Sequence, residues 1–170
     1  MEEIKFSKPK LDEAKHIFQL IKECPPLDLN SEYLYLLLCQ HFSDTCVVAK
    51  INSKIVGFVS GYLPPERKNT LFVWQVAVVK EHRGKGLASK MIKEIIQRPE
   101  LNIEFVEATI TPSNFASKSL FTSIASAYNS NIEMNHLFTE EKFGNQKHEE
   151  ENLVTIGPIV NSKPLEVNAQ

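Results

Sequence analysis

The sequence lacks the features of several protein classes. Its three cysteines, Cys24, Cys39 and Cys46, are an odd number and lack the paired spacing of a metal site. We therefore expect reduced, buried thiols and no bound metal. Lys and Arg number 19 against 21 Asp and Glu, and a net charge of −2 argues against a nucleic-acid partner. The longest apolar run, 33–39, is too short to span a membrane, and the charged N-terminus does not resemble a signal segment. These absences predict a cytoplasmic protein.

The remaining composition is that of a single globular domain. The chain has 170 residues, of which 42% are hydrophobic and 24% charged. We find no internal repeat and no domain boundary. We expect one domain over residues 1–160 and a disordered tail over 161–170, where no hydrophobic pattern remains.

Hydrophobic spacing predicts a mixed α/β (α+β) domain with the element order βααβββαβαββ. The polar stretch 140–152 is expected to be a mobile loop. The expected strands are 4–7, 45–51, 55–63, 70–79, 103–110, 131–138 and 153–159, and the expected helices are 11–21, 31–42, 84–97 and 115–125.

One segment carries a recognisable binding chemistry. Residues 75–89 pass from a β-rich run through a short polar turn into a glycine-spaced helix start. The first N–H groups of a helix have no internal partner and favour an anion, and glycines let a phosphate approach the backbone. The spacing is neither a Walker loop nor a dinucleotide fingerprint. Taken alone, the turn fits an anion site and a ligand-free, glycine-softened helix start equally well.

The residues around this turn resemble the acetyl-CoA-binding motifs of the GNAT superfamily. Arg83, Gly86 and Ala88 match the pattern Arg/Gln-x-x-Gly-x-Gly/Ala. Asn114 and Phe121 match the second cofactor segment, in which an asparagine meets the pantetheine and an aromatic ring packs beside the thiol.

The resemblance implies a single GNAT fold, with a mixed, mostly antiparallel sheet flanked by helices, and acetyl-CoA as co-substrate. It also implies that the backbone of a central strand pairs with the pantetheine arm. The implied cofactor-binding residues are Val76, Ala77, Val78, Arg83, Gly84, Lys85, Gly86, Leu87, Ala88, Asn114 and Phe121.

Further segments resemble the diaminobutyrate acetyltransferase family of ectoine biosynthesis. They cover residues 4–159, and the most distinctive is Leu71 to Val78. The resemblance implies transfer of acetyl from acetyl-CoA to the γ-amine of L-2,4-diaminobutyrate, which supplies the precursor of the compatible solute ectoine. It also implies a homodimer. The other matching segments are 26–33, 36–42, 56–62, 148–151 and 156–158.

The residue that removes the proton from the amine is left open. Phe121 stands where many GNAT members have a tyrosine general acid, and Phe72 stands where some have a glutamate base. Candidates for deprotonation, directly or through water, are Glu107, Asp28 and His148. Glu107 is equally well explained as the partner of a lysine at the sheet edge.

A diamino acid needs an acid for each ammonium group and donors for its carboxylate. Asp28 is a candidate for an ammonium, and its alternative role is to cap the helix that starts after Ser31. His148 lies in an acidic stretch that is either a solvated charge run or a loop closing over the substrate.

Three further residues are candidate substrate contacts. Of Tyr33 and Tyr35, one is expected to face the pocket and the other to pack in the core. Trp74 is expected to form a pocket wall, with the core as the alternative. Thr111 ends a strand and either contacts the substrate or closes its own turn.

Two other functions fit the same motifs. One is a GNAT enzyme that acetylates another small amine or a protein N-terminus. The other is a catalytically silent acyl-CoA-binding module, which the phenylalanines at positions 72 and 121 would suit.

Overall fold

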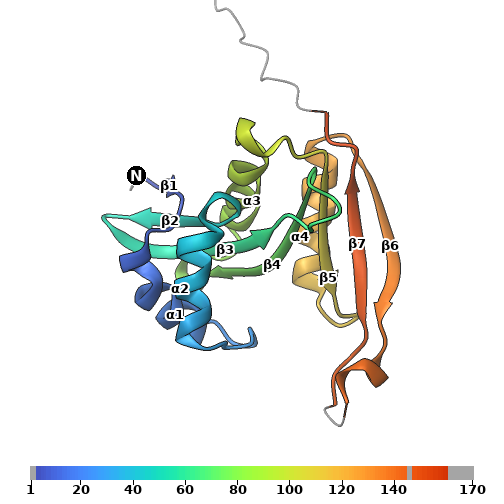
Figure 1. Ribbon diagram of the computed structural model, residues 1–170, viewed down its shortest axis with the longest axis horizontal. Helices are drawn as coiled ribbons and strands as arrows, with labels where there is room; N and C mark the ends of the chain where they lie inside the picture. The colour runs from blue at the N-terminus through green and yellow to red at the C-terminus, as the bar shows by residue number, and fades with distance from the viewer. Residues whose placement is uncertain (1–2, 145–146, 161–170) are drawn as a thin grey trace, which may run out of the picture.

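The computed structural model describes residues 3–144 and 147–160, so the tail expected at 161–170 lies outside the described residues. Within these ranges the chain forms seven strands and four α-helices in the predicted order (Figure 1). The strands are β1 (Lys5–Ser7), β2 (Val47–Ile51), β3 (Lys54–Tyr62), β4 (Thr70–Val78), β5 (Phe105–Ile110), β6 (Asn131–Phe138) and β7 (Glu151–Gly157). The helices are α1 (Ala14–Lys22), α2 (Glu32–His41), α3 (Leu87–Ile96) and α4 (Phe115–Ala127), and the 3-10 turns are η1 (Leu11–Glu13), η2 (Ser43–Thr45), η3 (Lys80–His82), η4 (Pro99–Leu101) and η5 (Glu140–Phe143).

The strands form one mixed sheet in the order β1-β2-β3-β4-β5-β7-β6. Neighbouring strands are antiparallel except β4 and β5, which are parallel. The β4–β5 pairing covers only Thr70–Phe72 against Phe105–Glu107, although both strands continue beyond it. In Figure 1 the strands up to β4 lie across the view, whereas β5, β7 and β6 run from top to bottom. The sheet is therefore split between the second halves of β4 and β5.

Two apolar clusters cover the sheet unequally. Helices α3 and α4 pack on one face, where they bury side chains from β2 to β5 and from β7. Helices α1 and α2 pack on the other face, and their cluster contains sheet residues from β2, β3 and β4 but none from β5, β6 or β7. We call the second face of β5 and β7 the open face; it carries Glu107, Thr109, Glu151, Leu153 and Thr155, which alternate with core residues.

Most element boundaries differ from the expected ones by up to three residues, and two of these differences lie in segments that were assigned to the site. The helix expected from Gly84 begins at Leu87, because Gly84 and Gly86 have φ angles of +71° and +74°, which a helix cannot contain. The stretch 140–152, expected to be a loop throughout, contains η5 and the first two residues of β7.

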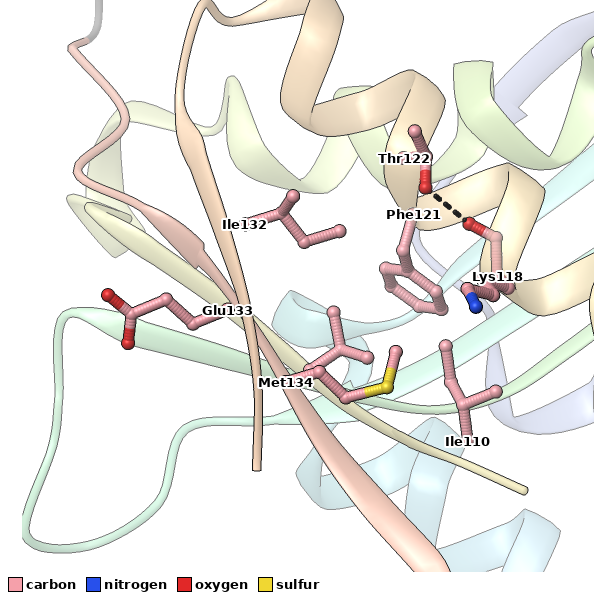
Figure 2. Close-up of a pocket in the computed structure, with 8 residues that line it drawn as sticks. Ile110, Lys118, Phe121, Thr122, Ile132, Glu133 and Met134 are labelled. Carbon is pink, nitrogen blue, oxygen red and sulfur yellow. Dashed lines mark hydrogen bonds between the residues drawn. The ribbon is translucent and has the colours of Figure 1, made fainter. Parts of the chain in front are cut away.

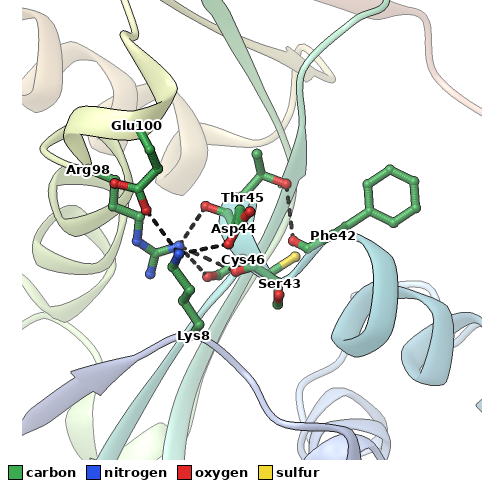
Figure 3. A network of polar contacts seen from close by, with 8 residues as sticks. All are labelled: Lys8, Phe42, Ser43, Asp44, Thr45, Cys46, Arg98 and Glu100. Carbon is green, nitrogen blue, oxygen red and sulfur yellow. Dashed lines mark hydrogen bonds and ion pairs between the residues drawn. The ribbon is translucent and has the colours of Figure 1, made fainter.

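A buried arginine joins the end of α3 to the turn before β2 (Figure 3). Arg98 is 7% exposed, and its Nη1 donates to the carbonyls of Asp44 at 2.7 Å and Cys46 at 2.8 Å. At the surface, Lys8 bridges Asp44 at 2.7 Å and Glu100 at 2.9 Å. Arg98 thus satisfies carbonyls that the short η2 turn leaves free, while the Lys8 pairs remain exposed to solvent.

We expect Arg98→Met to lower the free energy of unfolding by about 2–3 kcal/mol, because it leaves buried carbonyls without a donor. Urea denaturation followed by circular dichroism measures this change. Lys8→Met is the matched control and should hardly move the urea midpoint, because exposed ion pairs contribute little. Equal effects of the two substitutions would contradict the structural role assigned to Arg98.

Candidate active site

The turn between β4 and α3 presents an uncapped helix N-terminus. Nε of Arg83 donates to the carbonyl of Val78 at 2.8 Å and closes the turn. Gly86 occupies the N-cap position, where no side chain accepts from the helix. A Cβ atom at Gly84 or Gly86 would meet no heavy atom within 4 Å, so the space beside both glycines is open. The first N–H groups of α3 are thus available to an anion, which the helix dipole favours.

The other residues predicted for this part of the site surround the same turn. Lys85 is exposed, Leu87 is buried in the α3 core, and Ala88 is partly buried beside it. Val76, Ala77 and Val78 pair with β3, but the β4–β5 ladder ends before them, at Phe72. Their edge facing the split is therefore suited to pairing with an extended chain.

Asn114 and Phe121 have structural roles in α4. Asn114 caps the helix, because its side chain accepts from the backbone N–H of Ser117 at 3.0 Å. Phe121 is buried and lines a cavity of about 160 Å³ between α4 and β6. In Figure 2, Ile132 and Met134 of β6 point toward Phe121, and Glu133 points away. Contact of Asn114 and Phe121 with a cofactor remains a prediction.

Acidic side chains surround Glu151 of the open face. The Thr109 hydroxyl lies close to the Glu151 carboxylate. Burial, assisted by the negative charges of Asp28 and Glu149, raises the pKa of Glu151, while the Thr109 hydrogen bond and the nearby His148 oppose this shift. The structure therefore brings Asp28 and His148, which were predicted from the sequence, together with Glu151 and Thr109, which were not.

Asp28 is held by its backbone, and its side chain is exposed. Nε2 of Gln75 donates to the Asp28 carbonyl at 2.8 Å, and the hydroxyl of Tyr35 donates to Oε1 of Gln75 at 3.3 Å. The alternative role of Asp28 as the cap of α2 is wrong, because Ser31 occupies that position and accepts from Leu34 N at 3.4 Å. The Asp28 carboxylate is not needed to start α2.

Of the two tyrosines of α2, one packs in the core, and contact of the other with the substrate stays a prediction. Tyr35 is fully buried and packs edge-on against Phe18, with ring centroids 5.9 Å apart. Tyr33, two residues earlier, is 67% exposed. Trp74 is 45% exposed, so its alternative role as a core residue is wrong. Thr111 is partly buried, and its carbonyl accepts from Asn114 N at 3.0 Å, which closes the turn after β5.

His148 lies beside Glu151 in the segment that precedes β7. Its ring stacks on Phe143 of η5 with centroids 3.9 Å apart, and its Nε2 is 3.9 Å from the Glu151 carboxylate. The Ser113 hydroxyl donates to the carboxylate of Glu149 and so links this segment to the turn after β5. The acidic stretch is therefore packed against the open face at these points.

Glu107 forms an ion pair with Arg67. Its carboxylate accepts from Nη2 of Arg67 at 2.6 Å, and the Glu107 side chain is 9% exposed. The expected lysine at a sheet edge is wrong on both counts, because the partner is an arginine and β5 lies between β4 and β7. Arg67 was not predicted, since a single cation in the polar loop 64–69 has no sequence signal. Glu151 was within reach, because it ends the family-like segment 148–151.

In residues 3–144 and 147–160, no group of three or more His, Cys, Asp or Glu side chains is arranged to hold a metal ion. None of the helices within these same ranges is long and apolar enough to cross a membrane.

Comparisons with known proteins identify the family. The family model described as Acetyltransferase (GNAT) family matches residues 14–125. The L-2,4-diaminobutyric acid acetyltransferase of Marinococcus halophilus is 43% identical over 94% of this chain and 92% of that protein. Its counterpart from Methylotuvimicrobium alcaliphilum is 46% identical over 92% and 91%, respectively.

A solved structure gives the same result for the fold. It is the diaminobutyrate acetyltransferase EctA from Paenibacillus lautus, in complex with its substrate L-2,4-diaminobutyric acid and coenzyme A. It superposes with a TM-score of 0.89 at 36% sequence identity, over 95% of this chain and 99% of the other. With a matching family model, near-full-length relatives and the same fold, this chain belongs to the acetyltransferase (GNAT) family.

Proposed function

We propose that the protein transfers the acetyl group of acetyl-CoA to the γ-amine of L-2,4-diaminobutyrate, the acetylation step of ectoine biosynthesis. The products are CoA and Nγ-acetyl-2,4-diaminobutyrate. The observation that carries the proposal is the acidic environment beside the split in the sheet, where Glu151 lies on the open face and the negative charge of Asp28 acts on it. Two carboxylates there suit a substrate with two ammonium groups, in a chain 36% identical to an enzyme solved with that diamino acid.

The donor would lie along the split and the turn after β4. The uncapped start of α3 suits the pyrophosphate, and the free edge of Val76–Val78 suits the pantetheine arm. The resemblance to GNAT enzymes assigns the stabilisation of the tetrahedral oxyanion to the backbone N–H near Val76. The thiolate leaves readily, because a thiol pKa is about 8.5.

The acceptor must lose a proton before it attacks, since an alkyl ammonium has a pKa of about 10. Of the three candidates, Glu107 is the poorest acceptor, because the Arg67 guanidinium neutralises it. Asp28 and His148 flank Glu151, whose raised pKa makes it a better proton acceptor than an ordinary glutamate. We assign deprotonation of the amine to Asp28, His148 and Glu151, acting directly or through water. Asp28 and Glu151 would also bind the ammonium group before it loses its proton.

We also propose that the protein is a homodimer and that it is located in the cytoplasm. A homodimer is supported by β6, an edge strand on which Ile132, Met134, Leu137 and Phe138 are all more than 40% exposed. Sedimentation equilibrium giving a monomer mass would rule the dimer out. A cytoplasmic location is supported by three free, buried thiols, and fractionation of the source cells tests it.

Release of CoA separates the candidate functions. We expect rapid thiol release from acetyl-CoA with L-2,4-diaminobutyrate and at least about tenfold lower kcat/KM with ornithine, lysine or a peptide N-terminus, because a lost or misplaced counter-charge costs about 1.4 kcal/mol or more. Equal rates with ornithine would contradict the assigned substrate. Acetyl-CoA binding without release for any amine would favour the silent module suggested by Phe72 and Phe121.

The cofactor turn is tested at Gly86. We expect Gly86→Asp to weaken acetyl-CoA binding by at least about tenfold, because a carboxylate at the start of α3 repels the pyrophosphate. Isothermal titration calorimetry measures the affinity. Gly86→Ala is the control, because it carries the same strain at φ +74° without the charge and should bind more tightly than the Asp variant. Unchanged affinity in both variants would place the pyrophosphate elsewhere.

Glu151→Gln should separate activity from stability. The neutral amide keeps an acceptor for Thr109 but loses the charge that holds the ammonium, so kcat/KM for diaminobutyrate should fall about 10- to 100-fold. Folding raises the pKa of this carboxyl, so the native state loses stability as the pH rises through the interval between the ordinary and raised values. The variant should therefore have a higher Tm at pH 7 than the wild type.

The gain in Tm should disappear below about pH 3, where the carboxyl is protonated in both the folded and unfolded states. Glu150→Gln is the matched control, because Glu150 faces His136 and Asn152 instead of Asp28. A loss of activity in Glu150→Gln as large as in Glu151→Gln would show that general charge, not this position, matters.

A further inference from the structure

Arg67 is held in place by its own backbone. Its N–H donates to the carbonyl of Pro64 at 2.9 Å, and its carbonyl accepts from the N–H of Thr70 at 3.0 Å. At the end of the same loop, the carbonyl of Asn69 accepts from the N–H of Glu104 at 2.8 Å, and its side-chain amide donates to the Glu104 carboxylate at 2.9 Å. The loop 64–69 is therefore tied to the start of β5, and it delivers Arg67 to a defined position.

The guanidinium of Arg67 is anchored on one side and free on the other. Nη2 contacts the carboxylate of Glu107 at 2.6 Å, and Glu107 is almost completely buried. The Arg67 side chain is 53% exposed. Because a guanidinium carries five N–H donors in a fixed plane, this ion pair leaves donors that reach solvent over the open face.

The cation and the acidic group lie on the same face of the sheet. Glu107 and Thr109 point to the same side of β5, and Glu151, Leu153 and Thr155 point to that side of β7. Thr155 stands opposite Glu107 and Leu153 opposite Thr109, so Glu151 lies further along β7, on the Thr109 side of Glu107. In an extended 2,4-diamino acid, the γ-nitrogen and a carboxylate oxygen lie roughly 6 Å apart. The open face thus presents acids and an anchored cation at separate positions, as a substrate with opposite charges at its two ends requires.

We propose that Arg67 binds the α-carboxylate of the acceptor and thereby selects a diamino acid over a simple diamine. This inference rests on the proposed function and adds the residue that binds the substrate's α-carboxylate. Glu107 then acts as a positioning residue, which holds the guanidinium in its plane, and has no part in proton transfer. Bidentate contact from an arginine is the strongest side-chain recognition of a carboxylate.

The test compares two acceptors that differ only in the carboxylate, L-2,4-diaminobutyrate and 1,3-diaminopropane. In Arg67→Gln we expect kcat/KM for diaminobutyrate to fall about 10- to 100-fold through a higher KM, because one charge-assisted contact is lost. The KM for acetyl-CoA and kcat/KM for diaminopropane should change less than about threefold. Lys68→Gln, which removes the neighbouring exposed cation of the same loop, is the matched control and should behave as the wild type.

A second variant protects the test against misfolding. Arg67→Gln alone leaves Glu107 as an unpaired buried charge, whereas the double variant Arg67→Gln with Glu107→Gln removes both charges. The double variant should show the same loss for diaminobutyrate and the same indifference for diaminopropane. A double variant with wild-type kcat/KM for diaminobutyrate would overturn the inference, since Arg67 would then serve only to neutralise Glu107.

The remaining outcomes distinguish a failure of this inference from a failure of the proposed acetyltransferase function. Equal losses for both acceptors in the two Arg67 variants overturn the carboxylate contact and leave the acetyltransferase proposal intact. A wild-type protein that acetylates diaminopropane as well as diaminobutyrate also overturns carboxylate selection. A wild-type protein that acetylates neither overturns the proposed function and this inference together.

Discussion

The divergence of β4 and β5 is the constraint on which both halves of the site depend. The two strands are parallel neighbours only as far as Phe72 and Glu107, and beyond that pair they separate inside a seven-stranded sheet. Unpaired backbone groups within a sheet are costly unless something satisfies them, so the split is suited to an extended arm that adds to β4. The uncapped start of α3 lies at one end of the split, and the open face lies beside it. Donor and acceptor can then meet at the split from opposite faces of the sheet.

The donor half could be predicted from the sequence, because its signals are local. Alternation along 70–79 and the glycine spacing after it identify a strand, a turn and a helix start without reference to distant residues. The error in this region was the first residue of α3, which is Leu87 and not Gly84. Its cause is also local, since Gly84 and Gly86 adopt left-handed backbone angles that the residue type permits but does not require.

The acceptor half could be predicted only in part, because its members come from separate elements. Asp28 and His148 were found through family-like segments, but nothing in the sequence shows that both approach Glu151. Their meeting depends on the register that sets Thr109 of β5 opposite Leu153 of β7. The expectation that Glu107 lies at a sheet edge was wrong because it also depended on long-range strand pairing. The chain inserts β7 between β5 and β6, so a strand expected at the edge became an interior one. Such long-range pairing leaves no periodic trace in the sequence.

The open face also shows why this part of the sheet carries no helix. A covering helix would bury Glu151 and Asp28 together, and two buried carboxylates without counter-ions are strongly unfavourable. Left open, Glu151 is only partly desolvated; this burial, with the negative charges of Asp28 and Glu149, raises its pKa. A substrate ammonium supplies positive charge beside these carboxylates. The cluster of negative charges therefore destabilises the ligand-free protein but favours binding of a cationic acceptor. The anchored Arg67 supplies the opposite sign on the same face of the sheet. Selectivity for a diamino acid then follows from charges that the fold leaves incompletely balanced.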